Sequence, residues 1–209
     1  MHSEMTVTTM ILLTLMTFKF EVSTICLLLN KMTRAQEMLS FFSGSVNRYP
    51  GEGPNERVFS PDEYKQLSLI LNWRKMLSNF WIAPFQLNGK TYRTVEHYFQ
   101  SEKLRLVDPA LADTFTVESG TPLGTEGTGL EARQMRKAKL LSKEQLKVWD
   151  TMKDDVMNCA WRAKFLQNEP LQKVLLATRT AELWHSCPRM APERFVGLEI
   201  LRNELRLTA

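Results

Sequence analysis

The segment from Leu77 to Lys103 contains polar side chains whose spacing could place a carboxylate and a cation on one face of a helix. At about 100° per residue, Glu96, Gln100 and Lys103 share a stripe. Glu96 and Lys103 are two turns apart, about 10 Å along the axis, which is too far for a close ion pair. A ligand could therefore lie between a general acid or base and an amine nucleophile or clamp. Periodicity alone leaves an alternative, an amphipathic helix with solvated charges.

A hairpin followed by a helix is predicted to position this stripe. Asn88 and Gly89 separate two half-apolar runs, and both residues tolerate positive φ, which is typical of a two-residue hairpin turn. Thr94 is a suitable N-cap, so the helix should begin at Val95. The apolar face of this helix would contain Val95, Tyr98, Phe99 and Leu106.

Cap and turn signals predict further helices. Ser60-Pro61 favours a helix through about Lys75, and Ser142-x-x-Gln145 matches a capping box at the start of a helix that continues to Gln167. Helices dominate, so the expected fold is mainly α (α+β), a single domain with a small antiparallel β-hairpin. The other predicted helices begin at Leu130 and at Pro170, and the last is marked by Phe195, Leu198 and Leu205.

A glycine-rich stretch precedes a basic one. Residues 116–129 hold four of the nine glycines, interleaved with threonines, and predict a long mobile loop. Its amides could bind phosphate, but no P-loop or dinucleotide fingerprint is present, so a solvent-exposed loop is favoured. Arg133 and Arg136 follow at i and i+3 and could bind one phosphate group, the alternative being a solvated face.

Composition limits the class of protein. The chain has 209 residues with 44% hydrophobic content, which fits one globular domain. Its net charge of +4 favours anionic ligands but does not form a dense nucleic-acid-binding stripe. Cys26, Cys159 and Cys187 are scattered, so we expect no metal, no cofactor and a reducing intracellular location, in the cytoplasm or nucleus.

The apolar N-terminal stretch is interrupted by charge. Lys19 and Glu21 lie within the run from Met10 to Leu29 and would be costly in a bilayer, so no membrane partner is expected. No basic region precedes the run as in a signal peptide. We interpret residues 1–31 as an extension, with a weak targeting function as the alternative, and residues 32–209 as the domain, expected to be monomeric.

Several segments together resemble the NADAR superfamily, whose name stands for NAD- and ADP-ribose-associated. The resemblance covers about residues 39–207 in the expected order, with residues 149–185 similar to the family's central and C-terminal helices. The segments that resemble the family are Phe41–Ser45, Leu77–Phe80, Asn88–Lys90, Thr94–Gln100 with Lys103, Trp149, Met152–Lys153, Val156–Met157, Ala163–Phe165, Gln167–Asn168, Leu175–Thr178 and Glu182–His185.

This resemblance implies hydrolysis of an N-glycosidic bond to a ribose that carries phosphate or ADP. Such a reaction develops oxocarbenium character, so it needs a carboxylate near the anomeric carbon, for which we expect Glu96. Lys103 would have one of two roles. It would be either a nucleophile that forms a Schiff base with the ribose or a cationic clamp on ribose or phosphate oxygens. The expected substrate-binding residues are Ser43, Gly44, Asn79, Phe80, Trp81, Tyr98, Gln100, Arg133, Arg136, Trp149, His185 and Arg189.

One departure concerns the substrate. The riboflavin-pathway branch of the family carries an Asp-x-x-Trp-Gly stretch near the C-terminus, whereas residues 186–194 here contain only one acid, Glu193. The leading hypothesis is removal of ADP-ribose from a modified guanine, in DNA or a nucleotide. The alternatives are hydrolysis of ribosylamino-pyrimidine phosphates of riboflavin biosynthesis and non-catalytic binding of ADP-ribose. The expected ligands are thus ADP-ribose or a ribose phosphate, with ADP-ribosylated DNA as the macromolecular partner.

Overall fold

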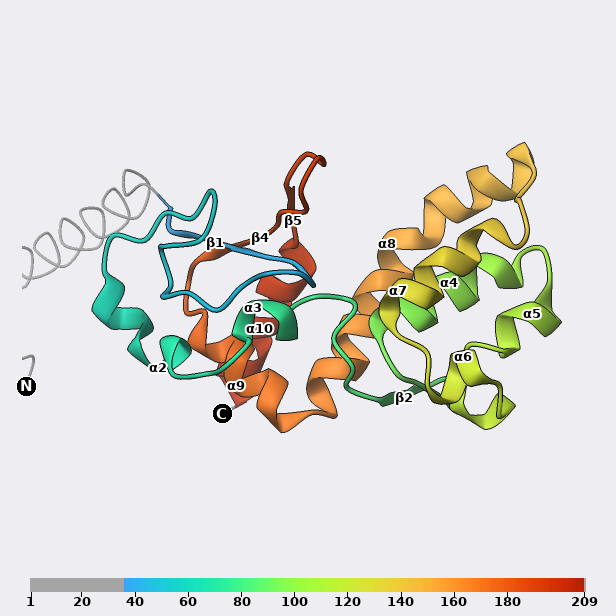
Figure 1. Cartoon of the computed structure of the whole chain (residues 1–209), viewed down its shortest axis with the longest axis horizontal. Helices are drawn as coiled ribbons and strands as arrows, with labels where there is room; N and C mark the ends of the chain where they lie inside the picture. The colour runs from blue at the N-terminus through green and yellow to red at the C-terminus, as the bar shows by residue number, and fades with distance from the viewer. Residues whose placement is uncertain (1–35, 209) are drawn as a thin grey trace, which may run out of the picture. The chain divides into compact units, whose positions relative to one another are not determined.

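A long helix, α8 (Lys143–Leu166), packs against several other elements of the computed structural model, which describes residues 36–208 (Figure 1). It begins at the predicted capping box, in which the Ser142 and Gln145 side chains each bond the other's backbone. Its neighbours are α4 (Val95–Arg105), α9 (Glu169–Ala177) and α10 (Val196–Thr208). The expectations for residues 1–31, including Cys26, lie outside the described residues.

The predicted hairpin and helix are present at the predicted positions. β2 (Phe85–Leu87) pairs antiparallel with β3 (Lys90–Tyr92), and the two turn residues have φ of 53° and 75°. The Thr94 hydroxyl accepts a hydrogen bond from the His97 backbone N–H at 3.2 Å, which caps α4. These local interactions fix where α4 begins, and so where its polar stripe lies.

Short helices replace the loop predicted for residues 116–129, so that prediction was wrong. The chain forms a 3₁₀ turn, η2 (Val117–Ser119), then α6 (Pro122–Thr125) and α7 (Gly129–Gln134). Threonine hydroxyls cap α6 and α7, because Thr121 and Thr128 accept hydrogen bonds from backbone amides three residues later. α7 begins one residue before Leu130 and continues as a 3₁₀ turn, η3 (Met135–Lys137). With α5 (Pro109–Asp113), these elements pack beside α4 (Figure 1).

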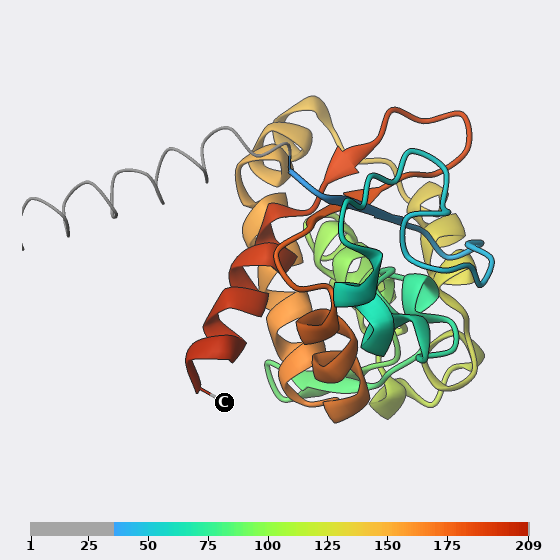
Figure 2. The same cartoon turned by 90° about the vertical axis from the view of Figure 1, so that its left-hand side faces the viewer.

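A three-stranded sheet was not predicted. β1 (Met38–Phe41) pairs in parallel with β4 (Glu182–His185), which pairs antiparallel with β5 (Glu193–Arg194). Figures 1 and 2 show the blue β1 beside the orange-red β4 at the other end of the colour scale. The expectation that residues 182–185 are helical was therefore wrong. Leu183 is fully buried between two partly exposed neighbours, an alternation typical of a strand.

The helix predicted through Lys75 is broken into three pieces. They are the 3₁₀ turn η1 (Pro61–Tyr64), α2 (Lys65–Ser68) and α3 (Trp73–Met76). Asn72 has φ of 62°, a left-handed conformation that a continuous helix cannot contain. Ser60 occupies the N-cap position of η1 with Pro61 following it, but its side chain makes no capping hydrogen bond.

The fold class is confirmed as mainly α with small β elements. The main core lies where β1, β4, α4, α8, α9 and α10 meet, and a smaller core under α4 contains Leu104, Ala112, Phe115 and Ala132. Among residues 36–208, no helix combines the length and apolar character needed to cross a bilayer.

Candidate active site

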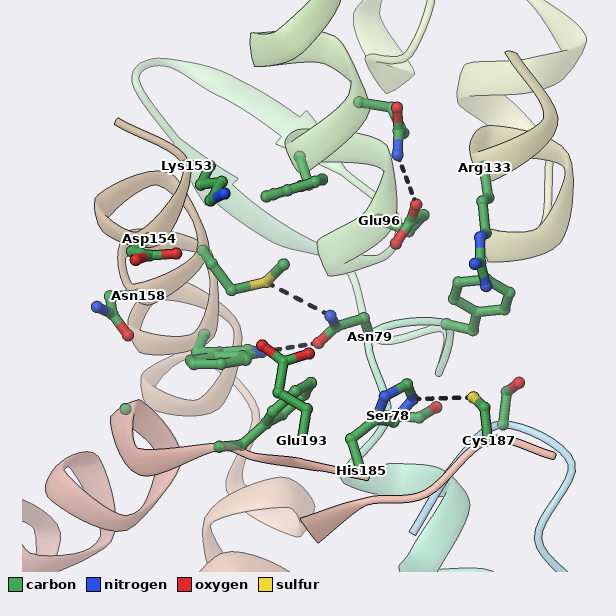
Figure 3. A pocket seen from close by; sticks show the side chains of 18 of the residues that line it. Ser78, Asn79, Glu96, Arg133, Lys153, Asp154, Asn158, His185, Cys187 and Glu193 are labelled. Atoms are coloured by element: carbon green, nitrogen blue, oxygen red, sulfur yellow. Dashed lines mark hydrogen bonds between the residues drawn. The ribbon is translucent and has the colours of Figure 1, made fainter. Parts of the chain in front are cut away.

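A cavity of about 610 Å³ opens between α4, α8, η3 and the chain that enters α10 (Figure 3). The structure brings together most of the residues that the sequence suggested. The predicted site residues that line the cavity are Ser43, Asn79, Phe80, Glu96, Gln100, Lys103, Arg133, Arg136 and His185.

Glu96 lies in the first turn of α4 with only 8% of its surface exposed. Its carboxylate accepts a hydrogen bond from the Gln100 amide at 2.8 Å, one turn along the same helix. Its backbone N–H donates to the Asn79 carbonyl at 3.2 Å, which joins the start of α4 to the preceding loop. The carboxylate is therefore held in position by both its helix and its neighbouring loop.

Burial decides the protonation behaviour of Glu96. From the sequence, two opposing effects on the pKa of Glu96 could not be ranked. A helix N-terminus favours the ionised carboxylate and lowers the pKa, whereas apolar packing disfavours it and raises the pKa. In the structure, burial raises the pKa of the Glu96 carboxyl, while the bond from Gln100 and the charges of Arg133, Arg136 and Lys103 oppose the rise. The net effect is a raised pKa, so burial outweighs the favourable hydrogen bond and charges.

Three cations line the cavity around this carboxylate. Lys103 lies on α4, Arg133 on α7 and Arg136 on η3. Within the described residues, none of the three makes an ion pair with an acid, in contrast to nearby Lys153, which bonds Asp150 at 2.9 Å. Cations without partners beside a cavity attract an anionic ligand. The arginines can also each offer a planar pair of N–H donors to a phosphate.

Acidic groups lie on the opposite side of the cavity. Figure 3 shows Asp154 and Glu193 across from Glu96 and Arg133, with Asn158 next to Asp154. Asp154 and Glu193 form no ion pair with any described residue, so their oxygens are available to accept hydrogen bonds from a ligand. Lys153 lies next to Asp154, and Arg194 also lines the cavity, so its wall carries charges of both signs.

Asn79 joins the loop below α4 to α8. Its side-chain oxygen accepts a hydrogen bond from the Trp161 indole N–H at 2.7 Å, and its amide nitrogen lies 3.4 Å from the Met157 sulfur (Figure 3). Next to it, Phe80 contacts the start of α7 so closely that a Cβ at Gly129 would lie 2.6 Å from the Phe80 Cα. Only glycine fits there, and this close approach places the arginines of α7 and η3 beside the loop.

His185 and Cys187 form a pair at the edge of the cavity. The His185 Nε2 lies 3.4 Å from the Cys187 sulfur, and the imidazole stacks on Phe195 with ring centroids 5.0 Å apart. Burial and the charge of Arg133 lower the pKa of His185, so the ring is a neutral hydrogen-bonding group. Burial raises the pKa of the Cys187 thiol, against the opposing effect of Arg133.

Five of the residues expected to bind the substrate do not line this cavity. The Tyr98 hydroxyl contacts Asn88 on the opposite side of α4, at 3.4 Å. Trp149 is buried with its ring edge-to-face on Phe99, and Trp81 packs against the main core. The two remaining residues, Gly44 and Arg189, line a neighbouring cavity.

Sequence reasoning missed the contribution of α8. Residues of this helix that line the cavity recur with helical spacing, which is a signal that could have been used. It was overlooked because the helix was analysed for its apolar positions. The lining residues on α8 that were not predicted are Lys153, Asp154, Met157, Asn158 and Trp161, and those on other segments are Ser78, Phe99, Cys187, Met190 and residues 193–197.

A buried carboxylate in a cavity lined by charged groups of both signs is typical of a small-ligand enzyme or binding site. The family model of the NADAR domain matches residues 69–191, more than half of the chain. The chain therefore belongs to the NADAR domain family, which confirms the resemblance.

The similar proteins are named as N-glycosidases. The N-glycosidase YbiA of Escherichia coli K12 is 36% identical over 106 residues, which are 51% of this chain and 59% of that protein. The YbiA of Shigella flexneri is 35% identical over the same length. The chain thus spans about three fifths of these relatives. The NMR structure of E. coli YbiA has a TM-score of 0.44 and 25% identity, covering 84% of this chain and 89% of that one.

A buried lysine holds the loop that carries Asn79 and Phe80. The Lys164 ammonium, on α8, donates to the Trp81 carbonyl at 2.8 Å and to the Ser78 carbonyl at 3.3 Å. Its side chain is completely buried with no carboxylate partner among the described residues, and burial lowers its pKa to about 7.

We predict that Lys164 makes stability rise with pH. Between the folded pKa of about 7 and the ordinary value of 10.5, the unfolded chain binds a proton that the folded chain does not. The free energy of unfolding should therefore increase from pH 7 to 9, by about 1.4 kcal/mol per unit from this group. Urea unfolding of Lys164→Met should lack this increase, and the control Lys147→Met, an exposed site on α8, should keep it. Parallel pH profiles for the wild type and Lys164→Met would contradict the assignment.

Proposed function

We propose that this protein hydrolyses the N-glycosidic bond between ADP-ribose and a guanine base, in DNA or a nucleotide, and releases ADP-ribose. The observation that carries the proposal is Glu96, a buried carboxylate that faces a cavity lined by Lys103, Arg133 and Arg136. The name N-glycosidase, printed for relatives 36% identical over 106 residues, supports the general reaction. The name does not specify the base that is released, so guanine as the substrate base is our own proposal.

The proposed chemistry uses the charge of Glu96. Departure of the base leaves positive charge on the anomeric carbon and the ring oxygen of the ribose, and a fixed carboxylate stabilises that charge. Water then adds to the anomeric carbon, Glu96 accepts its proton, and the departing base nitrogen takes up a proton. The raised pKa of Glu96 suits it to that proton transfer.

The remaining groups would bind the two ends of the substrate. Arg133 and Arg136 would pair with phosphate oxygens, as charge-assisted hydrogen bonds. On the opposite wall, the carboxylates of Asp154 and Glu193 fit the N–H donors of a guanine. Phe80 offers a ring on which a base could stack. A phosphate near one wall and a base near the other would place the glycosidic bond between them.

A second candidate substrate is a ribosylamino-pyrimidine phosphate. Its single phosphate would occupy the same arginines, and its amino groups would bond the same carboxylates, so one cavity of about 610 Å³ is sufficient for it. The reaction at the anomeric carbon would be the same. Base release from each substrate, followed by mass spectrometry, distinguishes the two.

We predict that Glu96→Gln abolishes base release from a guanine-ADP-ribosylated oligonucleotide while ADP-ribose binding is largely kept. The change preserves shape and removes the charge that stabilises the transition state. Glu102→Gln is a matched control on the same helix, since Glu102 bonds Arg105 and does not line the cavity. Near wild-type release by Glu96→Gln would contradict the role of Glu96. ADP-ribose binding by a wild type that releases no base would indicate a non-catalytic reader.

Lys103 could act in one of two ways, and trapping separates them. As a nucleophile, its neutral amine attacks the anomeric carbon, the base leaves with a proton, and ring opening gives an imine that water later hydrolyses. We predict that borohydride added during turnover reduces this imine to a stable secondary amine, which peptide mass spectrometry locates at Lys103. Lys103→Arg should then be inactive. An active Lys103→Arg variant with no trapped sugar would instead make Lys103 a cationic clamp.

A further inference from the structure

A second cavity, of about 450 Å³, adjoins the Glu96 cavity. It lies between the loop that follows β1 and the segment that connects β4 to β5. Cys187 and Met190 line both cavities, so the two are neighbours along one surface of the molecule. Figure 3 shows Cys187 beside His185 in the first cavity.

The second cavity combines apolar walls with available cations. Phe42, Pro188 and Pro192 provide flat apolar surfaces suited to an aromatic ring. Arg48 and Arg189 are exposed at its edge and make no ion pair with any described acid. An apolar slot flanked by such arginines fits a heteroaromatic base joined to a phosphate.

Two polar side chains that line this cavity, Arg74 and Ser186, differ in their hydrogen bonding. The guanidinium of Arg74 is fully committed, because it pairs with Glu56 at 2.7 Å and also donates to two backbone carbonyls. The Ser186 hydroxyl is buried and lacks a hydrogen-bond partner among the described residues.

We propose that this second cavity binds the adenosine monophosphate half of ADP-ribose, while the Glu96 cavity holds the ribose that carries the scissile bond. The inference rests on the proposed function. A ribosyl monophosphate needs only the first cavity, whereas ADP-ribose has a second nucleoside to place. Arg133 lines the first cavity, and Cys187 lines both cavities, so an arginine of the first cavity and the wall shared with the second could both contact the two phosphates.

The test compares two ligands that differ by this half. Calorimetry with the full chain would measure ADP-ribose and ribose 5-phosphate against two variants of the second cavity. Val46→Trp fills the cavity, and Arg189→Gly removes a cation without straining the backbone, because Arg189 has φ of 67°. Arg179→Gly is the matched control, an exposed arginine with φ of 52° that pairs with Glu63 and lines neither cavity.

We expect both variants to weaken ADP-ribose binding about tenfold or more and to leave ribose 5-phosphate binding unchanged. Arg179→Gly should change neither affinity, and adenosine monophosphate should compete with ADP-ribose in the wild type.

Three results would overturn the inference. They are unchanged ADP-ribose affinity in both variants, equal weakening of the two ligands, and wild-type affinity for ADP-ribose no greater than for ribose 5-phosphate. If the affinity of a single-stranded oligonucleotide falls in the variants and that of ADP-ribose does not, the cavity serves a DNA strand and the inference is also wrong. These binding results are independent of turnover, so loss of the proposed hydrolase activity would not by itself produce any of them.

Discussion

The burial of the Glu96 carboxylate is the constraint on which the site depends. Removing an ionised carboxylate from water costs several kcal/mol unless nearby groups compensate. Here the compensation comes from one hydrogen bond of Gln100 and from three cations that are close enough to oppose the rise in the pKa of Glu96. The same cations make the cavity attractive to an anionic ligand. Stabilisation of the carboxylate and binding of phosphate thus use the same groups.

The position of Glu96 depends on contacts made far from it in the sequence. The Thr94 cap fixes the start of α4, and the Asn79 carbonyl receives the Glu96 backbone N–H. The loop that contains Asn79 is held in turn by Lys164, whose buried ammonium bonds the carbonyls of Ser78 and Trp81. α8 therefore contributes both a wall of the cavity and the support for the opposite wall, which explains why a single helix packs against so many elements.

The parts of the site that local sequence signals control could be predicted. The Asn88-Gly89 turn, the Thr94 cap and the stripe of Glu96, Gln100 and Lys103 all follow from interactions within a few residues. The pairing of β1 with β4 could not be predicted, because its two strands lie at opposite ends of the domain and Glu182–His185 has no local pattern that excludes a helix. The glycines near 120 suggested a loop, but threonine caps and close packing made short helices instead.

Resemblance and structure made different contributions to the site. Resemblance identified Glu96 and Lys103, while the structure separated the lining residues from Tyr98, Trp81 and Trp149, which face the core or another surface. It also revealed Asp154, on the side of the cavity opposite Arg133. Periodicity locates a face of a helix but does not say which neighbouring element covers that face, so this distinction required the tertiary contacts.

The most direct test of this account is a pH titration of the Glu96 carboxyl by NMR with carbon-13-labelled glutamate, assigned by comparison with Glu96→Gln. We predict a midpoint above the ordinary value of 4.5, because burial outweighs the favourable charges. The midpoint should rise further in Arg133→Ala and Arg136→Ala, since each removes a charge that stabilises the ionised form. A midpoint at or below 4.5, or one that does not move when the arginines are removed, would contradict the claim that Glu96 is a buried carboxylate balanced by the cations of its cavity.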